Sequence, residues 1–155
     1  MPEIPMSTKI DRFHVPLIIY SPLLQRQAKF SSISSHFDIT PSILAYLSTN
    51  FNIQGPSLVS WMGSGLDTMR NLQNNHLIPL MQTKTDIVDF VLGKYHLNGN
   101  EVFELSDQLD ETPVNESNVK ENLQSAFQFF KQKNDRLIQG AKLIPDSIYN
   151  AYYPK

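Results

Sequence analysis

Four histidines are the side chains of this sequence best suited to chemistry, but they are scattered. His14, His36, His76 and His96 are the four, and none stands four residues from another or beside a His-Glu pair, so no zinc signature results. The sequence has no cysteine, which excludes disulfides, a thiol nucleophile and a cysteine-based zinc site. No serine lies in a Gly-x-Ser-x-Gly elbow. The residues alone therefore indicate no complete active centre.

Two places still carry local signals for an anion. His36 and Asp38 stand just before an expected helix N-terminus, where an anion is favoured. The alternative, which we favour, is that Asp38 or Thr40 satisfies free N–H groups of that helix and His36 lines the loop. Residues 63–65, Gly-Ser-Gly, invite a phosphate-loop interpretation. They lack the Gly-Lys-Ser/Thr ending and the third glycine of the known phosphate loops, so we expect a tight turn.

Composition limits the classes of partner. The 155 residues carry a net charge of −2, with only 18% charged residues, and suffice for one substantial core. No short window holds more than two or three Lys or Arg residues, so neither nucleic acid nor an anionic membrane surface is a predicted partner. The apolar runs are too short for a transmembrane helix, and residues 1–3 begin no signal peptide. The lack of cysteine fits cytosolic and extracytoplasmic proteins equally.

The elements expected in the first half form a strand, a loop and a helix. Residues 17–20, behind Val15-Pro16, form a short β-branched apolar run that predicts a buried strand. Thr40 as N-cap and Pro41 predict the start of a helix. Such a strand, apolar on both faces, needs neighbours on both sides. These neighbours come either from later segments or from a part of the protein upstream of this sequence. Residues 30–35 are a candidate for a further short strand.

The second half predicts short antiparallel strands followed by a long helix. Apolar runs between residues 78 and 105, with Asn98-Gly99 as a type I′ turn signal, indicate three or four strands. Residues 106–115 are acidic and turn-rich. Residues 118–139 have helical spacing, an Asn118/Glu121 pair resembling a capping box, and Gly140 as a stop. The expected core face of this helix comprises Val119, Leu123, Ala126, Phe127, Phe130 and Leu137. The alternative use of that face is partner binding.

Two passages resemble the sulfatase family, within the alkaline-phosphatase-like superfamily. The first is Val-Pro-Leu-Ile-Ile at residues 15–19, followed by Asp-Ile-Thr-Pro-Ser-Ile-Leu at 38–44 and Gly-Pro-Ser-Leu at 55–58. It is similar to the family's V-P-L-I-I, D-I-x-P-T-L-L and G-x-S-L, with Ser42 where Thr is usual. The second is Gly-Lys-Tyr-His-Leu at 93–97, then residues 101–107 and 110–115. It resembles the family's C-terminal G-x-Y-K-L, L-Y-D-L and D-P-x-E-x-x-N, with His96 where Lys is common.

The resemblance implies an α/β fold, present here as an α+β fragment. Residues 1–75 would supply the terminal strand and helix of an alkaline-phosphatase-like α/β domain. Residues 76–155 would form a small antiparallel sheet packed on a long C-terminal helix. The family's nucleophile and its metal-binding Asp-His-Gly precede the Val-Pro strand and have no match here, since residues 21–26 do not fit the nucleophile motif. We therefore expect a C-terminal fragment, inactive alone, in which Met1 is internal or added.

For the intact enzyme, the resemblance implies attack by the nucleophile on a sulfate or phosphate ester, assisted by a divalent metal such as calcium, manganese or zinc. It implies a sulfated or phosphorylated glycan or lipid as substrate, the missing N-terminal part as partner, and an extracytoplasmic location. No metal ligand is expected in this chain. Lys9, His14 and His36 are the candidates to line the catalytic cleft. An exposed sheet edge would favour self-association. The alternative is a stand-alone binding or structural module.

Overall fold

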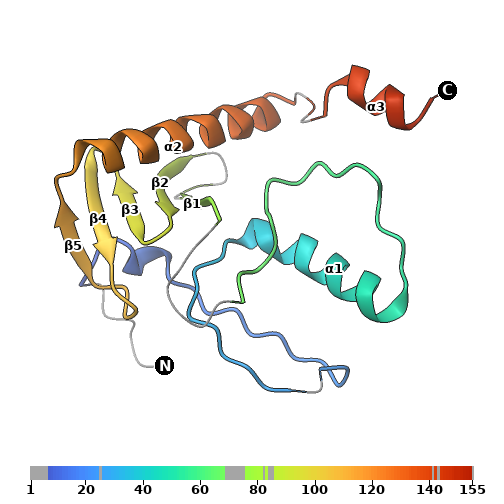
Figure 1. The fold of residues 1–155 in the computed structure, drawn as a ribbon, viewed down its shortest axis with the longest axis horizontal. Helices are drawn as coiled ribbons and strands as arrows, with labels where there is room; N and C mark the ends of the chain where they lie inside the picture. Colours follow the sequence, from blue (N-terminus) through green and yellow to red (C-terminus); the bar gives the residue numbers. More distant parts are fainter. Residues whose placement is uncertain are drawn as a thin grey trace.

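An antiparallel sheet flanked by helices forms the centre of the structure, a computed structural model that describes residues 7–24, 26–68, 76–81, 83, 86–140, 142 and 144–154. Figure 1 shows the long helix α2 along one side of the sheet, and α1 apart from both. Strands and helices are thus segregated along the chain, which confirms the coarse α+β class. The predicted domain boundary lies after residue 75. Residues 69–75 are outside the described residues, so this boundary stays a prediction.

The sheet has five strands in the order in which they follow one another along the chain. They are β1 (Ile78–Met81), β2 (Ile87–Leu92), β3 (Tyr95–Asn98), β4 (Glu101–Leu105) and β5 (Glu111–Val114), all paired antiparallel. The prediction of three or four strands missed β5, because its sequence Glu-Thr-Pro-Val reads as a turn. Pro113 is tolerated there, since β5 is an edge strand that pairs only with β4.

The hairpin between β3 and β4 has a different turn from the one predicted. Asn98 pairs with Glu101, so the two loop residues are Gly99 and Asn100. Only Gly99 has a positive φ, of 60°, which matches a type II′ turn with glycine at its first central position. The Asn-Gly pair therefore straddles the end of β3, and Asn98 belongs to the sheet.

Helix α2 (Ser117–Ile138) covers one face of the sheet, as predicted. Leu123 and Phe130 are buried in a cluster with Phe90 and Leu97 of the sheet. Val119, Ala126 and Phe127 pack against the same cluster, whereas Leu137 is 38% exposed. Gly140 follows the helix with φ 75°, as expected of a C′ residue, but the N-cap is Glu116 and no side chain caps the start. The predicted Asn118 cap is wrong.

The other face of the sheet is covered by residues 7–13, called here the N-terminal strap. It ends in the 3-10 helix η1 (Asp11–Phe13). Ile10 is buried in a second apolar cluster with Ile78, Leu80, Val91 and Leu105. The Asp11 carboxylate accepts hydrogen bonds from the N–H groups of Ser7 and Thr8, which turn the strap back on itself.

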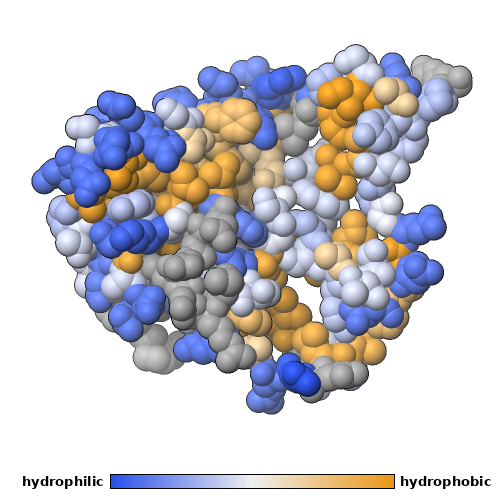
Figure 2. Space-filling model, in the orientation of Figure 1, coloured by the Kyte–Doolittle hydropathy of each residue, from blue (hydrophilic) through white to orange (hydrophobic). Residues whose placement is uncertain are grey.

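The strands predicted in the first half are not formed. Residues 14–21 and 30–35 carry no strand in the structure, and no ladder of the described residues includes them. Without neighbours to pair with, the apolar run stays on the surface, with Ile18 85% and Tyr20 90% exposed. The interpretation that later segments supply neighbouring strands for residues 17–20 is thus contradicted for the described residues. Figure 2 shows apolar surface along the lower edge of the molecule, where this part of the chain runs.

Helix α1 (Ile39–Phe51) is preceded by the 3-10 helix η2 (His36–Asp38). Thr40 is therefore inside the helix and is not the N-cap, while Pro41 still lies in the first turn, where no N–H is needed. No residue of α1 is buried, and Ile43 is 50% exposed. The short helix α3 (Asp146–Tyr152) also has no buried residue.

Asp38 joins the start of α1 to a distant loop. Its carboxylate is 2% exposed and accepts hydrogen bonds from Ser35 N and Oγ at 2.7 and 2.9 Å. It also accepts from the N–H groups of Ser64 at 2.8 Å and Gly65 at 3.3 Å. The loop's N–H groups, which a phosphate would need, are thus committed to Asp38. Residues 63–65 form no hydrogen-bonded turn, and the tight turn expected there stays a prediction.

A substitution at Gly63 tests the close approach of the two segments at this junction. A Cβ atom at Gly63 would lie 2.0 Å from the Phe37 carbonyl oxygen. We expect Gly63→Ala to lower the free energy of unfolding by about 1–3 kcal/mol, since backbone must move to admit the methyl group. Urea denaturation measures the change. The control is Gly55→Ala, whose Cβ would meet only the Leu44 side chain at 3.4 Å. Equal stability of the two variants would contradict the close approach.

Candidate functional site

The most concentrated set of titratable groups lies on the face of the sheet beneath the strap. Side chains alternate between the two faces of a strand, and antiparallel pairing brings matching positions together. Asp89 pairs with Asn98, and His96 pairs with Phe103. Glu111 on β5 faces the same side, because it contacts His96. The result is a cluster of one imidazole, two carboxylates and one amide, called here the strap cluster.

His96 lies at the centre of the strap cluster with no exposed surface. Its Nδ1 is 2.5 Å from Oε1 of Glu111, and its Nε2 is 3.2 Å from Oδ2 of Asp89. Carboxylates accept hydrogen bonds and donate none, so both contacts are satisfied when each ring nitrogen carries a proton. The ring also lies near Phe103, with 6.2 Å between ring centroids.

Asp89 is 2% exposed and accepts hydrogen bonds from three side chains on two elements, β3 and η1. Burial by itself raises the pKa of this carboxyl group, but hydrogen bonds from His96, Asn98 and Arg12 oppose burial and hold the pKa below its ordinary value of 3.8. Asn98 donates its amide to both oxygens at 2.8 and 2.9 Å. The Arg12 guanidinium donates to Oδ2 at 2.9 Å. The buried charge is therefore fully compensated, as a stable fold requires.

The strap is attached to the sheet through this cluster. Arg12 reaches Asp89, and the backbone N–H of Lys9 donates to Oε2 of Glu111 at 2.7 Å. The Lys9 ammonium forms an ion pair with Glu101 and lies 4.7 Å from the centroid of the Phe103 ring. Each carboxylate that contacts His96 thus also holds one residue of the strap.

A carboxylate–imidazole–carboxylate chain is a set of residues that can share and move protons, as general acid–base catalysis needs. Here, however, the strap covers it, and the side chains of Glu111 and Asp89 are 6% and 2% exposed. A substrate has no access to these atoms. The arrangement therefore fastens the strap and balances buried charge rather than performing catalysis.

The divalent metal implied by the resemblance does not fit these residues. The oxygens of Asp89 are occupied by Asn98, Arg12 and His96, and both nitrogens of His96 face carboxylates. Within the described residues, no group of three or more His, Cys, Asp or Glu side chains is arranged to hold a metal ion. We therefore assign no metal ligand to this part of the chain.

The structure does not bring the three predicted cleft residues together. Lys9 is paired with Glu101 beside the strap cluster, whereas His14 and His36 are exposed, after η1 and at the start of η2 respectively. No hydrogen bond or ion pair of the described residues joins any two of them. Their role as cleft-lining groups stays a prediction.

The sequence reasoning missed Asp89 and Glu111 and gave His96 no role beyond a motif position. A signal was present. Within residues 87–92, Asp89 is the only charged residue among apolar ones, and a charge in such a strand must find partners. Its partners could not be named from the sequence, because Arg12 is 77 residues away along the chain.

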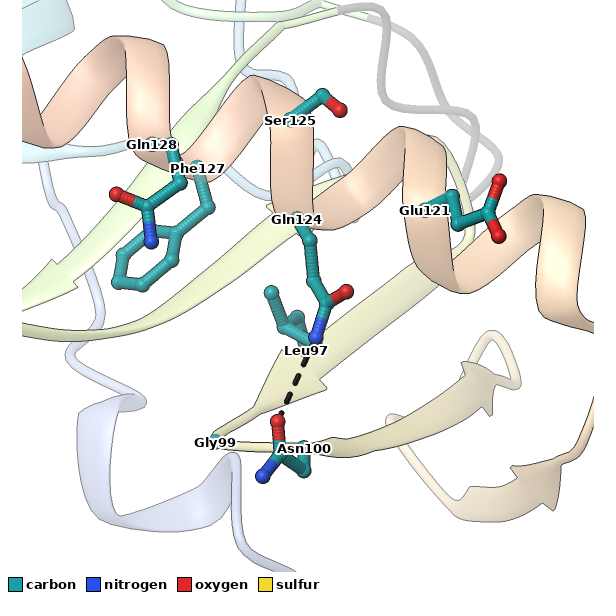
Figure 3. Close-up of a pocket in the computed structure, with 8 residues that line it drawn as sticks. All are labelled: Leu97, Gly99, Asn100, Glu121, Gln124, Ser125, Phe127 and Gln128. Carbon is teal, nitrogen blue, oxygen red and sulfur yellow. Dashed lines mark hydrogen bonds between the residues drawn. The ribbon is translucent and has the colours of Figure 1, made fainter.

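A shallow groove of about 670 Å³ lies between α2 and the β3–β4 turn. Figure 3 shows Gln124 directed from the helix toward Asn100, while Ser125 points away from that turn. The contact between Gln124 and Asn100 is long, at 3.5 Å. The groove gathers neutral side chains and one acidic residue, Glu121, and no titratable group lies buried in it. It indicates no chemistry.

Comparisons of the chain with known protein families, with curated proteins and with solved structures found no match. The resemblance to the sulfatase family therefore rests on the sequence passages alone. Separately, none of the helices in the described ranges is both long and apolar enough to cross a bilayer.

The lowered pKa of Asp89 makes the free energy of unfolding depend on pH in the acid range. Because its pKa in the folded chain is below 3.8, its contribution is present above that pH and is lost as the pH falls through the folded value. We expect Asp89→Asn to lower the free energy of unfolding by about 1–3 kcal/mol at neutral pH, with a smaller difference from the original chain below pH 3.8. Urea denaturation across this pH range measures both. Glu121→Gln, an exposed residue of α2, is the control; a pH-independent gap would contradict the role of Asp89.

Proposed function

We propose that this chain forms the C-terminal part of a metal-dependent sulfatase-like enzyme, which hydrolyses sulfate esters or transfers a phospho-substituent. In that enzyme the chain completes the scaffold, while nucleophile and metal ligands come from another part of the protein. The observation that carries the proposal is the order of the sequence passages at residues 15–19, 38–44, 93–97 and 101–115. Each passage is short, but together they run along most of the chain in the order found in the family.

The position of the later passages in the fold supports this proposal. Residues 93–97 span the turn into β3, residues 101–105 are β4, and residues 110–115 contain β5. The resemblance implies a small antiparallel sheet followed by a packing helix in this place. The observed sheet and α2 have that arrangement.

The exposed apolar surface of the first half is a second line of support. Residues that are apolar on both faces of a strand are typical of the inside of a parallel sheet covered by helices. In residues 15–24 and on α1, exposed large side chains are Val15, Leu17, Ile18, Ile19, Tyr20, Leu23, Leu24, Ile43 and Phe51. A surface of this kind marks a contact with another part of the protein. In the proposal, that part is the α/β sheet of the enzyme.

The proposal gives this chain a limited role at the active site. In the proposal, Lys9, His14 and His36 remain the candidates to line the cleft; His14 and His36 are exposed. The substrate class is a sulfated or phosphorylated glycan or lipid outside the cytoplasm, as the resemblance implies. The choice between sulfatase and transferase chemistry depends on the nucleophile, which this proposal places in another part of the protein.

Turnover assays test the proposal directly. We expect hydrolysis of an aryl sulfate or an aryl phosphate diester, with calcium, manganese or zinc, by a chain extended through the coding sequence upstream of Met1. The 155-residue chain alone should show none, because the described residues supply neither nucleophile nor metal site. The preferred substrate distinguishes the two reactions. Activity of the short chain alone, or the lack of an Asp-His-Gly upstream, would overturn the proposal.

A second candidate function is a stand-alone binding or structural module. The observation that favours it is the sheet with its own core on both faces, under α2 on one side and under the strap on the other. Such a unit needs no further layer to be stable.

Self-association separates the two candidates. If the apolar residues 15–24 belong against a missing sheet, the isolated chain should associate as its concentration rises, because this surface is free. Sedimentation velocity measures the effect. Replacing Ile18 and Tyr20 together by Ser should reduce association, whereas Gln27→Ser, an exposed polar control, should not. A monomer at every concentration would favour the stand-alone module.

A further inference from the structure

Asn98 combines two features that occur together at no other asparagine of the chain. It is the only asparagine followed by glycine, and its side-chain amide is part of the strap cluster. Gly99 lies at the exposed turn between β3 and β4, where a Cβ atom would meet nothing within 4 Å. Figure 3 shows Gly99 next to Asn100 at this turn. No hydrogen bond of the described turns and loops uses the Gly99 N–H.

We propose that Asn98 is a site of spontaneous deamidation, and that conversion of its amide to a carboxylate loosens the N-terminal strap. The backbone nitrogen of Gly99 attacks the side-chain carbonyl carbon of Asn98 and forms a new C–N bond. The bond to the amide nitrogen breaks, and ammonia leaves with the proton from Gly99. Water then opens the cyclic imide at either carbonyl, giving aspartate or an isoaspartyl link. Glycine permits this because it has no Cβ to obstruct ring closure.

The strap cluster controls the rate of this reaction. The Asn98 amide donates to both oxygens of Asp89 at 2.8 and 2.9 Å, and it must leave Asp89 before its carbonyl carbon can reach Gly99. Any opening that separates these two residues therefore exposes the amide to attack. The rate of deamidation at Asn98 therefore depends on how often the strap cluster opens.

The product is incompatible with the cluster. A carboxylate at position 98 accepts hydrogen bonds and donates none, so it replaces a donor to Asp89 with a second negative charge at contact distance. Two carboxylates, Asp89 and Glu111, already face His96, and among the described residues Arg12 is the one Lys or Arg side chain that contacts Asp89. An isoaspartyl link also lengthens the backbone where Asn98 pairs with Glu101. Either product weakens the attachment of Arg12 and Lys9.

The first experiment follows deamidation of the full chain by peptide mass spectrometry during incubation in mildly alkaline buffer. We expect aspartate and isoaspartate at position 98 before any other asparagine changes, and a several-fold faster reaction in Asp89→Ala. Glu104→Gln, which breaks the exposed ion pair with Lys94 instead, is the matched control and should keep the original rate. If Asp89→Ala fails to fold by circular dichroism, Arg12→Gln serves for the same comparison. An unchanged rate in the folded variant, or earlier reaction at another asparagine, would overturn the proposal.

The second experiment tests the consequence for the strap. Hydrogen exchange of the backbone amides of residues 8–13 should be several-fold faster in Asn98→Asp than in the original chain. Asn100→Asp, which adds the same charge at the same turn, should leave this exchange unchanged, because Asn100 does not contact Asp89. Equal exchange rates in Asn98→Asp and Asn100→Asp would show that a charge at position 98 does not weaken the strap cluster. That result would overturn the proposed effect of deamidation on the strap.

Discussion

A buried negative charge must be compensated where it lies, and this requirement organises one whole face of the sheet. Asp89 is inside, so the fold supplies it with an imidazole and an amide from β3 and a guanidinium from η1. The guanidinium comes from the strap, and bringing it there places Ile10 over the apolar residues of the same face. Charge compensation and apolar burial thus depend on one another. A strap without Arg12 would leave Asp89 with less compensation, and a sheet without Asp89 would hold the strap less firmly.

The two faces of the sheet are stabilised by different means. Under α2 the contacts are apolar and aromatic, with Phe90 within 6.1 Å of Phe130 and 5.8 Å of Phe127 between ring centroids. Such contacts depend mainly on area and shape. Under the strap, a polar cluster specifies which residues meet, because hydrogen bonds to charged groups require particular partners. Apolar burial under α2 favours folding in general, whereas the polar contacts under the strap specify which segments pair.

The first half of the chain also contains a buried carboxylate that is compensated by hydrogen bonds. Asp38 is a second buried carboxylate, and its partners join η2 to the loop at Ser64 and Gly65. This polar junction orders irregular segments that have few buried apolar groups of their own. The helix that follows buries no residue. The exposed apolar side chains of α1 and of residues 15–24 support the proposed place of this chain in a larger enzyme, because such a surface is typical of a contact with a further layer.

Only local features of the fold were predictable from the sequence. The helical period from Val119 to Phe130, the glycine after the helix and the alternation in residues 101–105 are properties of neighbouring residues, and each specified its element. The position of the strap, the partners of Asp89 and the lack of a strand at residues 15–20 depend on tertiary contacts. Pairing joins residues far apart in sequence: Lys9 meets Glu111, 102 residues away. A strand likewise exists only where neighbours accept its hydrogen bonds, and no local pattern can provide them.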